Sequence, residues 1–272
     1  MTDPHDLDAM RESVRAVYDA HSKTFLDWAG PTFQSGLLRT GSDGTEDPGR
    51  HNLEMARRAG VTDGEQVLDC GCGVGGPALD VAAAYPALQI QGVTISPVQV
   101  QLATELAAER GMADRVTFQA ADYHELPFPD CTFDGVWFFE SAEYSWDPET
   151  LFREALRVLK PGGWLFQKGL FRRDGPISGA PLEHLRELER VWGVSAGLPA
   201  PSETWGTIEA VGFDLLHTAL LDGEVGQERY VGAMVEIGPT GIPRLNPFGE
   251  VVFVPHADIP LCYAECRARK PG

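Results

Sequence analysis

Short apolar runs alternate with segments of helical spacing between Gln66 and Arg173. Strand-length apolar runs separated by helix-length segments are typical of βαβ units, in which helices join parallel strands. The pattern therefore predicts an α/β fold with a mostly parallel sheet. The predicted strands are 66–70, 89–94, 115–120, 133–139 and 163–170, and the predicted helices between them are 75–85, 97–110 and 148–159.

Two of these helices carry terminal signals. Ser96 and Pro97 are expected to be the N-cap and the first helical residue of the helix 97–110, because a hydroxyl caps free N–H groups and proline suits the first turn. The helix 148–159 is expected to be closed by Pro161, Gly162 and Gly163.

The chain before this core predicts a helix, a loop-rich lid and a second helix. Apolar residues recur at helical spacing over 7–20, and glycine and proline then interrupt the pattern from Gly30 to Gly49. The second helix runs from about Gly49 to Arg58. It ends at Gly60, since glycine suits a left-handed C-cap.

The chain after Arg173 has a weaker pattern, which is expected to complete the sheet. Residues 261–266 are interpreted as a buried edge of the last strand. A proline- and glycine-rich excursion over 237–258 and the lid are the candidates for covering a substrate. The predicted elements are helices near 181–192, 203–211 and 226–236 and strands near 213–220 and 259–267.

The composition is that of a globular protein with a strongly acidic surface. Hydrophobic residues make up 43% of the chain and charged residues 23%, which is enough apolar surface for a sizeable core. Lys and Arg number 22 and Asp and Glu 40, so the net charge is −18. This charge disfavours nucleic acids and anionic membranes, because both are bound through Lys and Arg. The expected partner is a small molecule, and the sequence leaves a homo-oligomer open.

The targeting and cysteine signals predict a cytoplasmic protein without membrane insertion. The segment Met1–Met10 has three Asp and no basic residue, unlike a signal peptide, and no apolar stretch approaches the roughly 18 to 20 residues that span a bilayer. The cysteines are five, an odd number that fits no disulfide framework. Cys70 and Cys72 lack partners at zinc-ligand spacing, so they are predicted to be buried thiols, and no metal site is expected.

A glycine-rich turn between the first strand and its helix predicts a cofactor loop. Gly71, Gly73 and Gly76 satisfy G-x-G-x-x-G, so binding of a nicotinamide or flavin dinucleotide has to be weighed. A dinucleotide fold expects an acid about 20 residues further on for the ribose hydroxyls. No acid stands at the end of the second strand, and the acid instead precedes the loop, as Asp69. Both features argue against a dinucleotide.

Five motifs follow one another along the core: Asp69-x-Gly71-x-Gly73-x-Gly75, Gly92-Val93-Thr94-Ile95-Ser96-Pro97-Val98-Gln99, Ala121-Asp122-Tyr123, Phe138-Phe139-Glu140-Ser141 and Arg157-Val158-Leu159-Lys160-Pro161-Gly162-Gly163. Through these motifs the chain resembles the class I S-adenosylmethionine-dependent methyltransferases over about residues 49–173. The Thr94 and Glu140 segments narrow the likeness to the branch of sterol, tocopherol and geranyl diphosphate C-methyltransferases, cyclopropane fatty acid synthases and several natural-product O-methyltransferases.

The resemblance implies a Rossmann-like fold with a seven-stranded, mostly parallel sheet. Residues 1–48 would form an N-terminal lid of helix and loop, and 49–173 the core that binds S-adenosylmethionine. Residues 174–272 would complete the sheet and carry a substrate cap.

The resemblance also implies which residues touch the cofactor. Asp69 with the backbone of the glycine turn would hold the amino acid tail, and Asp122 the adenine amino group. Thr94 stands where many class I enzymes have an acid for the ribose, and Gln99 is the substitute found in the resembled branch. The implied set is Tyr18, Ser35, Gly36, Asp69, Gly71, Cys72, Gly73, Thr94, Ile95, Gln99, Asp122, Tyr123 and Phe138.

Glu140 falls just past the fourth strand, where ligands bind in parallel sheets. The resemblance implies that it is the catalytic base, because the geranyl diphosphate and sterol enzymes have a similarly placed glutamate. Methylation of an alkene carbon leaves a carbocation, which aromatic faces stabilise and a base deprotonates. Phe139, Tyr144 and Trp146 are the predicted substrate contacts. The alternative is that the rings pack the sheet and that Glu140 binds the cofactor tail or a backbone group. Trp137 and Phe139 share one strand face and Phe138 the other, so one set at most lines the pocket.

Further polar residues have weaker interpretations. His124 could serve as a base, although a surface turn is its expected place. Arg39, Arg172 and Arg173 could meet an anionic head group, with Mg²⁺ if the substrate is a diphosphate. Solvated surface charge is the expected role for each.

The predicted function is transfer of a methyl group from S-adenosylmethionine to a small, largely apolar natural product. The first choice of acceptor is an alkene carbon of an isoprenoid, such as a prenyl diphosphate or a terpenoid. The alternatives are O- or N-methylation of a secondary metabolite and, in a different class, a cyclase or scaffold that binds the cofactor without transferring the methyl group.

Overall fold

The computed structural model describes residues 7–40, 47–192, 194, 196–226, 242–245, 251–254 and 260–272. Its strands include β2 Gln66–Cys70, β3 Gln89–Thr94, β4 Val116–Ala120, β5 Phe133–Phe139, β6 Leu159–Arg172, β7 Asp214–Leu220 and β11 Leu261–Arg269. Its helices include α1 Leu7–Ala29, α2 Pro48–Ala59, α3 Gly76–Ala84, α4 Pro97–Glu109, α5 Pro148–Val158, α6 Ala180–Trp192 and α7 Pro201–Ala210.

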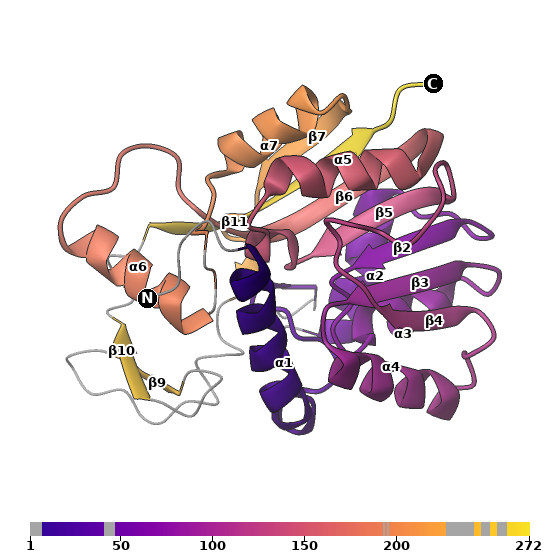
Figure 1. Cartoon of the computed structure of the whole chain (residues 1–272), viewed down its shortest axis with the longest axis horizontal. Coiled ribbons are helices and arrows are strands. Elements are labelled where there is room, and N and C mark those ends of the chain that lie inside the picture. Colours follow the sequence, from indigo (N-terminus) through magenta and orange to yellow (C-terminus); the bar gives the residue numbers. More distant parts are fainter. Residues whose placement is uncertain are drawn as a thin grey trace.

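The seven strands form one sheet in the order β4-β3-β2-β5-β6-β11-β7 (Figure 1). Strands β2 to β6 pair in parallel, and β11 runs antiparallel to β6 and β7. This arrangement confirms the predicted seven-stranded, mostly parallel sheet. Residues 261–266 lie in the last strand and 262–266 are buried, as expected, but this strand is an inner one, because the edges of the sheet are β4 and β7.

Aspartate or serine followed by proline starts three of the helices. Asp47, Ser96 and Asp147 accept hydrogen bonds from backbone N–H groups one turn later, at 3.0 to 3.1 Å, and a proline follows each of them. Gly60 ends α2 with a φ of 85°. The predicted caps at Ser96 and Gly60 are therefore confirmed.

Three boundaries differ from the prediction. Helix α1 continues to Ala29, well beyond residue 20. Helix α5 already ends at Val158, because Leu159 turns to extended backbone and pairs with Phe133. Pro161, Gly162 and Gly163, expected to close the helix, therefore lie in the first part of β6.

The segment predicted to be the lid, hereafter the lid, contains a short strand that the sequence pattern did not predict. Strand β1 (Leu37–Leu38) pairs antiparallel with β8 (Val225–Gly226). The predicted helix 226–236 lies outside the described residues from position 227 onward. Within 237–258, the described residues form β9 (Ile242–Leu245) and β10 (Val251–Val254), which pair with each other.

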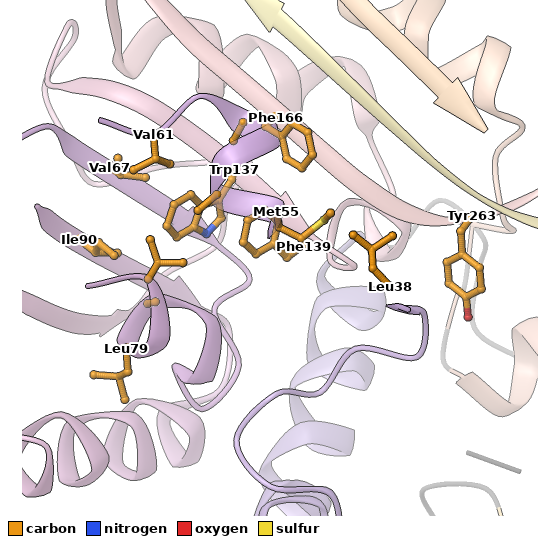
Figure 2. Packing of buried hydrophobic residues seen from close by; sticks show 14 of the residues in the cluster. Leu38, Met55, Val61, Val67, Leu79, Ile90, Trp137, Phe139, Phe166 and Tyr263 are labelled. Atoms are coloured by element: carbon orange, nitrogen blue, oxygen red, sulfur yellow. The ribbon is translucent and has the colours of Figure 1, made fainter. Parts of the chain in front are cut away.

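Two hydrophobic clusters cover the two faces of the sheet. Residues of α2 and α3 pack with Trp137 and Phe139, whose rings stack at 4.9 Å (Figure 2). Residues of α5 and α7 pack on the other face, where the rings of Phe138 and Phe152 lie 5.8 Å apart. Among the described residues, no helix is long and apolar enough to cross a bilayer.

A pair of glycine substitutions tests this packing. A Cβ at Gly135 in β5 would lie 2.1 Å from the ring of Trp164, whereas one at Gly206 in α7 would meet nothing within 4 Å. We expect Gly135→Ala to lower the free energy of unfolding by about 1 to 3 kcal/mol, because the core is overpacked. Gly206→Ala should raise it by about 0.5 to 1 kcal/mol, since alanine favours the helix. Urea denaturation measures both, and equal effects would contradict the packing described here.

Candidate active site

One pocket lies at the carboxyl ends of β2, β3 and β5. Here the strand order changes direction, because β3 and β4 lie on one side of β2 and β5 and β6 on the other. Open parallel sheets bind their ligands at such a position. Many of the predicted site residues line it: Tyr18, Asp69, Gly71, Cys72, Gly73, Thr94, Ile95, Gln99, Asp122, Tyr123, Phe139, Glu140, Tyr144 and Trp146.

The glycine turn after β2 lets three segments approach closely. Gly71 has a φ of 81°, and a Cβ there would lie 2.4 Å from the Cβ of Ser141. A Cβ at Gly76 would lie 2.2 Å from the carbonyl oxygen of Pro31 in the lid. The N–H of Gly71 donates to the carbonyl of Val93 at 2.8 Å, so this turn is held firmly beneath the pocket.

Asp69 places an uncompensated carboxylate in the pocket wall. Its side chain is buried, and its Oδ2 has no hydrogen-bond partner among the described residues. Burial raises the pKa of Asp69 to about 7. A buried carboxylate oxygen without a donor is a site for a cationic or N–H-bearing ligand.

Asp122, a second carboxylate of the pocket, is hydrogen-bonded to His124. The carboxylate accepts from the backbone N–H of His124 at 2.9 Å and lies 2.7 Å from its Nδ1. Burial opposes ionisation, but these bonds lower the pKa of Asp122. The His124 ring also contacts Ser145 at 2.8 Å and packs on Trp146 at 4.2 Å between ring centroids. Its side chain is 8% exposed, so the expected surface position was wrong.

Aromatic rings form another part of the wall. Phe139, Tyr144 and Trp146 line the pocket, and the ring of Tyr18 meets that of Tyr144 edge-on at 5.9 Å. Phe138 does not line it, because alternation along β5 turns its side chain to the opposite face of the sheet. Its cofactor contact stays a prediction that the described lining does not support.

Glu140 connects the end of β5 to the lid. Its Oε2 accepts from the N–H and the hydroxyl of Ser35, both at 2.6 Å, and its Oε1 accepts from the N–H of Gly36 at 2.9 Å. The backbone at Glu140 has a φ of 53°, a left-handed conformation that costs a non-glycine residue about 1 to 3 kcal/mol. Ser35 and Gly36, predicted cofactor contacts, are brought to the site through this carboxylate and are not among the lining residues.

Two residues of this cluster were missed by the sequence analysis. Lys168 of β6 is fully buried and forms an ion pair with Glu140. The hydroxyl of Tyr263 in β11 lies 2.8 Å from that of Ser35. The sequence does carry a signal for Lys168, because it stands inside the otherwise buried strand 164–171. A lysine is almost never fully buried unless it is paired, so this position indicates an acidic partner.

The other charged candidates lie elsewhere. Arg172 pairs with Glu203, and Arg173 pairs with Asp222 at 2.8 Å. The backbone N–H of Arg39 donates to Glu224. None of the three arginines is among the lining residues, so the structure does not support their contact with an anionic head group in this pocket. The described part of the chain holds no group of three metal-ligating side chains.

Residues 68–167 match the family model described as a methyltransferase domain. This stretch is a methyltransferase domain. It contains the glycine turn, Asp122 and Glu140, and thus most of the residues that line the pocket.

The relatives of the methyltransferase domain belong to the resembled branch. Sterol 24-C-methyltransferase of Eremothecium gossypii is 33% identical over 152 residues, 56% of this chain and 40% of that protein. Chloroplastic tocopherol O-methyltransferase of Arabidopsis thaliana is 43% identical over 116 residues, 40% of this chain and 33% of that protein. The chain therefore spans less than half the length of these relatives.

A solved structure covers more than the methyltransferase domain. The [4+2]-cyclase SpnF is 28% identical, with a TM-score of 0.74 over 95% of each chain. These comparisons confirm the predicted resemblance and the class I fold.

Glu143, close to Glu140, generates a prediction about pH. Burial and the charge of Glu140 raise the pKa of Glu143 to about 8 from an ordinary 4.5. The native state therefore retains a proton that the unfolded chain has lost, so this contribution to stability is complete below about pH 4.5 and is lost as the pH rises to about 8. Over that range the wild type should lose up to about 1.4 kcal/mol of its free energy of unfolding per pH unit through this group, and Glu143→Gln should abolish this loss.

Urea denaturation of the wild type and the variant from pH 5 to pH 8 measures this difference. Glu209→Gln removes the same charge from an exposed position and serves as the control. Parallel stability curves for the wild type and Glu143→Gln would show that Glu143 is ionised in the native state.

Proposed function

We propose that the chain binds S-adenosylmethionine in this pocket and transfers its methyl group to a small, largely apolar acceptor. The observation that carries the proposal is the combination, in one pocket, of the unpaired buried oxygen of Asp69 with an aromatic wall. The first suits the ammonium group of the cofactor's amino acid tail, and the second suits an apolar molecule.

The charge of the pocket supports a cationic ligand. The lining that the structure describes includes Asp69, Asp122 and Glu140 but no Lys or Arg. Lys168 compensates the charge of Glu140 from outside the lining, and Asp69 and Asp122 are left to attract a sulfonium ion. Thr94 and Gln99, joined at 2.5 Å, are the proposed ribose contacts, and Asp122 is the proposed acceptor for the adenine amino group.

The proposed chemistry rests on positioning. When bound, S-adenosylmethionine supplies a methyl group on a positively charged sulfur, which is open to direct attack. The walls formed by Phe139, Tyr144 and Trp146 would hold the acceptor in line and exclude water. Such positioning contributes up to about 7 to 11 kcal/mol in favourable cases.

Carbon is the proposed acceptor atom, in an isoprenoid or a similar alkene. The similarity to sterol 24-C-methyltransferase supports this choice, and so does the aromatic wall, since ring faces stabilise a carbocation. Glu140 stays the predicted base. To accept a proton, however, it would have to give up donors that occupy both of its oxygens.

A cyclase or scaffold role is the second candidate. It is favoured by the similarity to the [4+2]-cyclase SpnF over 95% of both chains and by the occupied oxygens of Glu140. Both candidates require the cofactor pocket, but only the first requires turnover of the cofactor.

Binding of S-adenosylhomocysteine tests the pocket. Titration calorimetry should show binding to the wild type and to Gly206→Ala. Gly71→Ala should weaken it at least about tenfold, equivalent to about 1.4 kcal/mol, because a Cβ there strains a φ of 81° and clashes with Ser141. Uptake of NADH or FAD together with no uptake of S-adenosylhomocysteine would overturn the assignment.

Incubation with isotopically labelled donor tests the reaction. Prenyl diphosphates, sterols and phenols would be offered as acceptors, and the products analysed by mass spectrometry and NMR. We expect label on carbon. Label on oxygen would favour the tocopherol-type alternative, and a rearranged acceptor without label would favour the cyclase.

A further inference from the structure

Lys168 is a fully buried lysine whose ammonium group is compensated from several sides. It donates to the carboxylate of Glu140 and to the carbonyl oxygen of Gly36. The ring of Tyr263 lies beneath it, with 4.9 Å between Nζ and the ring centroid. A buried ammonium ion is tolerated only with such partners, so the position of Lys168 depends on the lid.

The carboxylate of Glu140 depends on the lid in the same way. Three of its donors are the N–H and hydroxyl of Ser35 and the N–H of Gly36, and the fourth is Lys168. Each carboxylate oxygen thus accepts from two donors. This cluster joins the lid, β5 and β6, which are far apart in the sequence.

Tyr263 fixes the lid from the last strand. Its hydroxyl lies 2.8 Å from that of Ser35. Its ring packs so closely on Gly36 that a Cβ there would come within 2.3 Å. Ser35, Gly36, Glu140, Lys168 and Tyr263 are called the lid latch below.

We propose that the lid latch holds residues 31–38 closed over the pocket, and that Lys168 is the positioning residue that keeps Glu140 directed at the lid. Phe33 and Gln34, which directly precede Ser35, line the pocket. The latch therefore positions two residues of the pocket wall. The proposal rests on the proposed function in one respect, namely that S-adenosylmethionine is the ligand retained.

The proposal gives Glu140 a role other than proton acceptor. Protonation would leave Lys168 as a buried charge without its counter-ion, which is strongly unfavourable. Burial opposes ionisation of Glu140, but Lys168 and the lid donors outweigh it and lower its pKa. Glu140 is therefore held as an anion that anchors the lid.

Hydrogen–deuterium exchange of the ligand-free chain tests the latch directly. We expect Lys168→Met to accelerate exchange at Ser35 and Gly36 at least about tenfold, because their acceptor is released. Lys160→Met is the matched control, since Lys160 lies at the other end of β6 and forms a half-exposed pair with Asp134 at 2.8 Å. Lys160→Met should leave the exchange rates of residues 31–38 unchanged.

A second variant keeps the test decisive if Lys168→Met does not fold. Tyr263→Phe retains the ring and loses only the contact with Ser35, and it should accelerate lid exchange several-fold. Exchange in β5 is the internal reference. Unchanged exchange of residues 31–38 in the folded latch variants would overturn the proposal.

Glu140→Gln separates the latch from the base. If Glu140 acts in the latch, this variant should show faster lid exchange and faster dissociation of S-adenosylhomocysteine than the wild type. Loss of the maximal rate with unchanged dissociation and unchanged lid exchange would make Glu140 the base and refute the latch. Absence of S-adenosylhomocysteine binding to the wild type would instead refute the proposed function, and the exchange data would still decide on the latch.

Discussion

A carboxylate buried at the end of a strand needs partners, and in this chain the partners of Glu140 connect most of the site. Lys168 supplies the opposite charge from β6, and the lid supplies N–H and hydroxyl donors. These contacts stabilise Glu140 in its left-handed backbone conformation. Lid, sheet and last strand are therefore joined through one charged group, and the shape of the pocket depends on it.

The same cluster determines which charges face the pocket. Lys168 pairs with Glu140 but is not a lining residue, so the described lining contains carboxylates and no Lys or Arg. Glu140 and Glu143 are neighbours with opposite shifts, because Lys168 favours the ionised form of the first while burial and the first charge favour the neutral form of the second. A positively charged ligand and an apolar acceptor both fit such a lining.

Local signals predicted much of the framework and part of the site. The strand that contains Asp69, the glycine turn and the capped helices are encoded within a few residues, and they appear where expected. Predictions failed where two neighbouring signals compete. Pro161 to Gly163 could end a helix or begin a strand, and pairing of Leu159 with Phe133 decided for the strand. His124 has the sequence of a surface turn, yet Trp146 covers it.

The sequence by itself determined the order of the elements, the cofactor turn and the acidic character of the chain, because periodicity, caps and charge are properties of neighbouring residues or of composition. Only the tertiary structure decided that Phe139 rather than Phe138 faces the pocket, since alternation alone does not say which face of β5 is covered. It alone also brought Ser35, Glu140, Lys168 and Tyr263 together. Their contacts span more than two hundred positions, and hydrogen bonds and charge pairs act over a few ångströms in space without regard to distance along the chain.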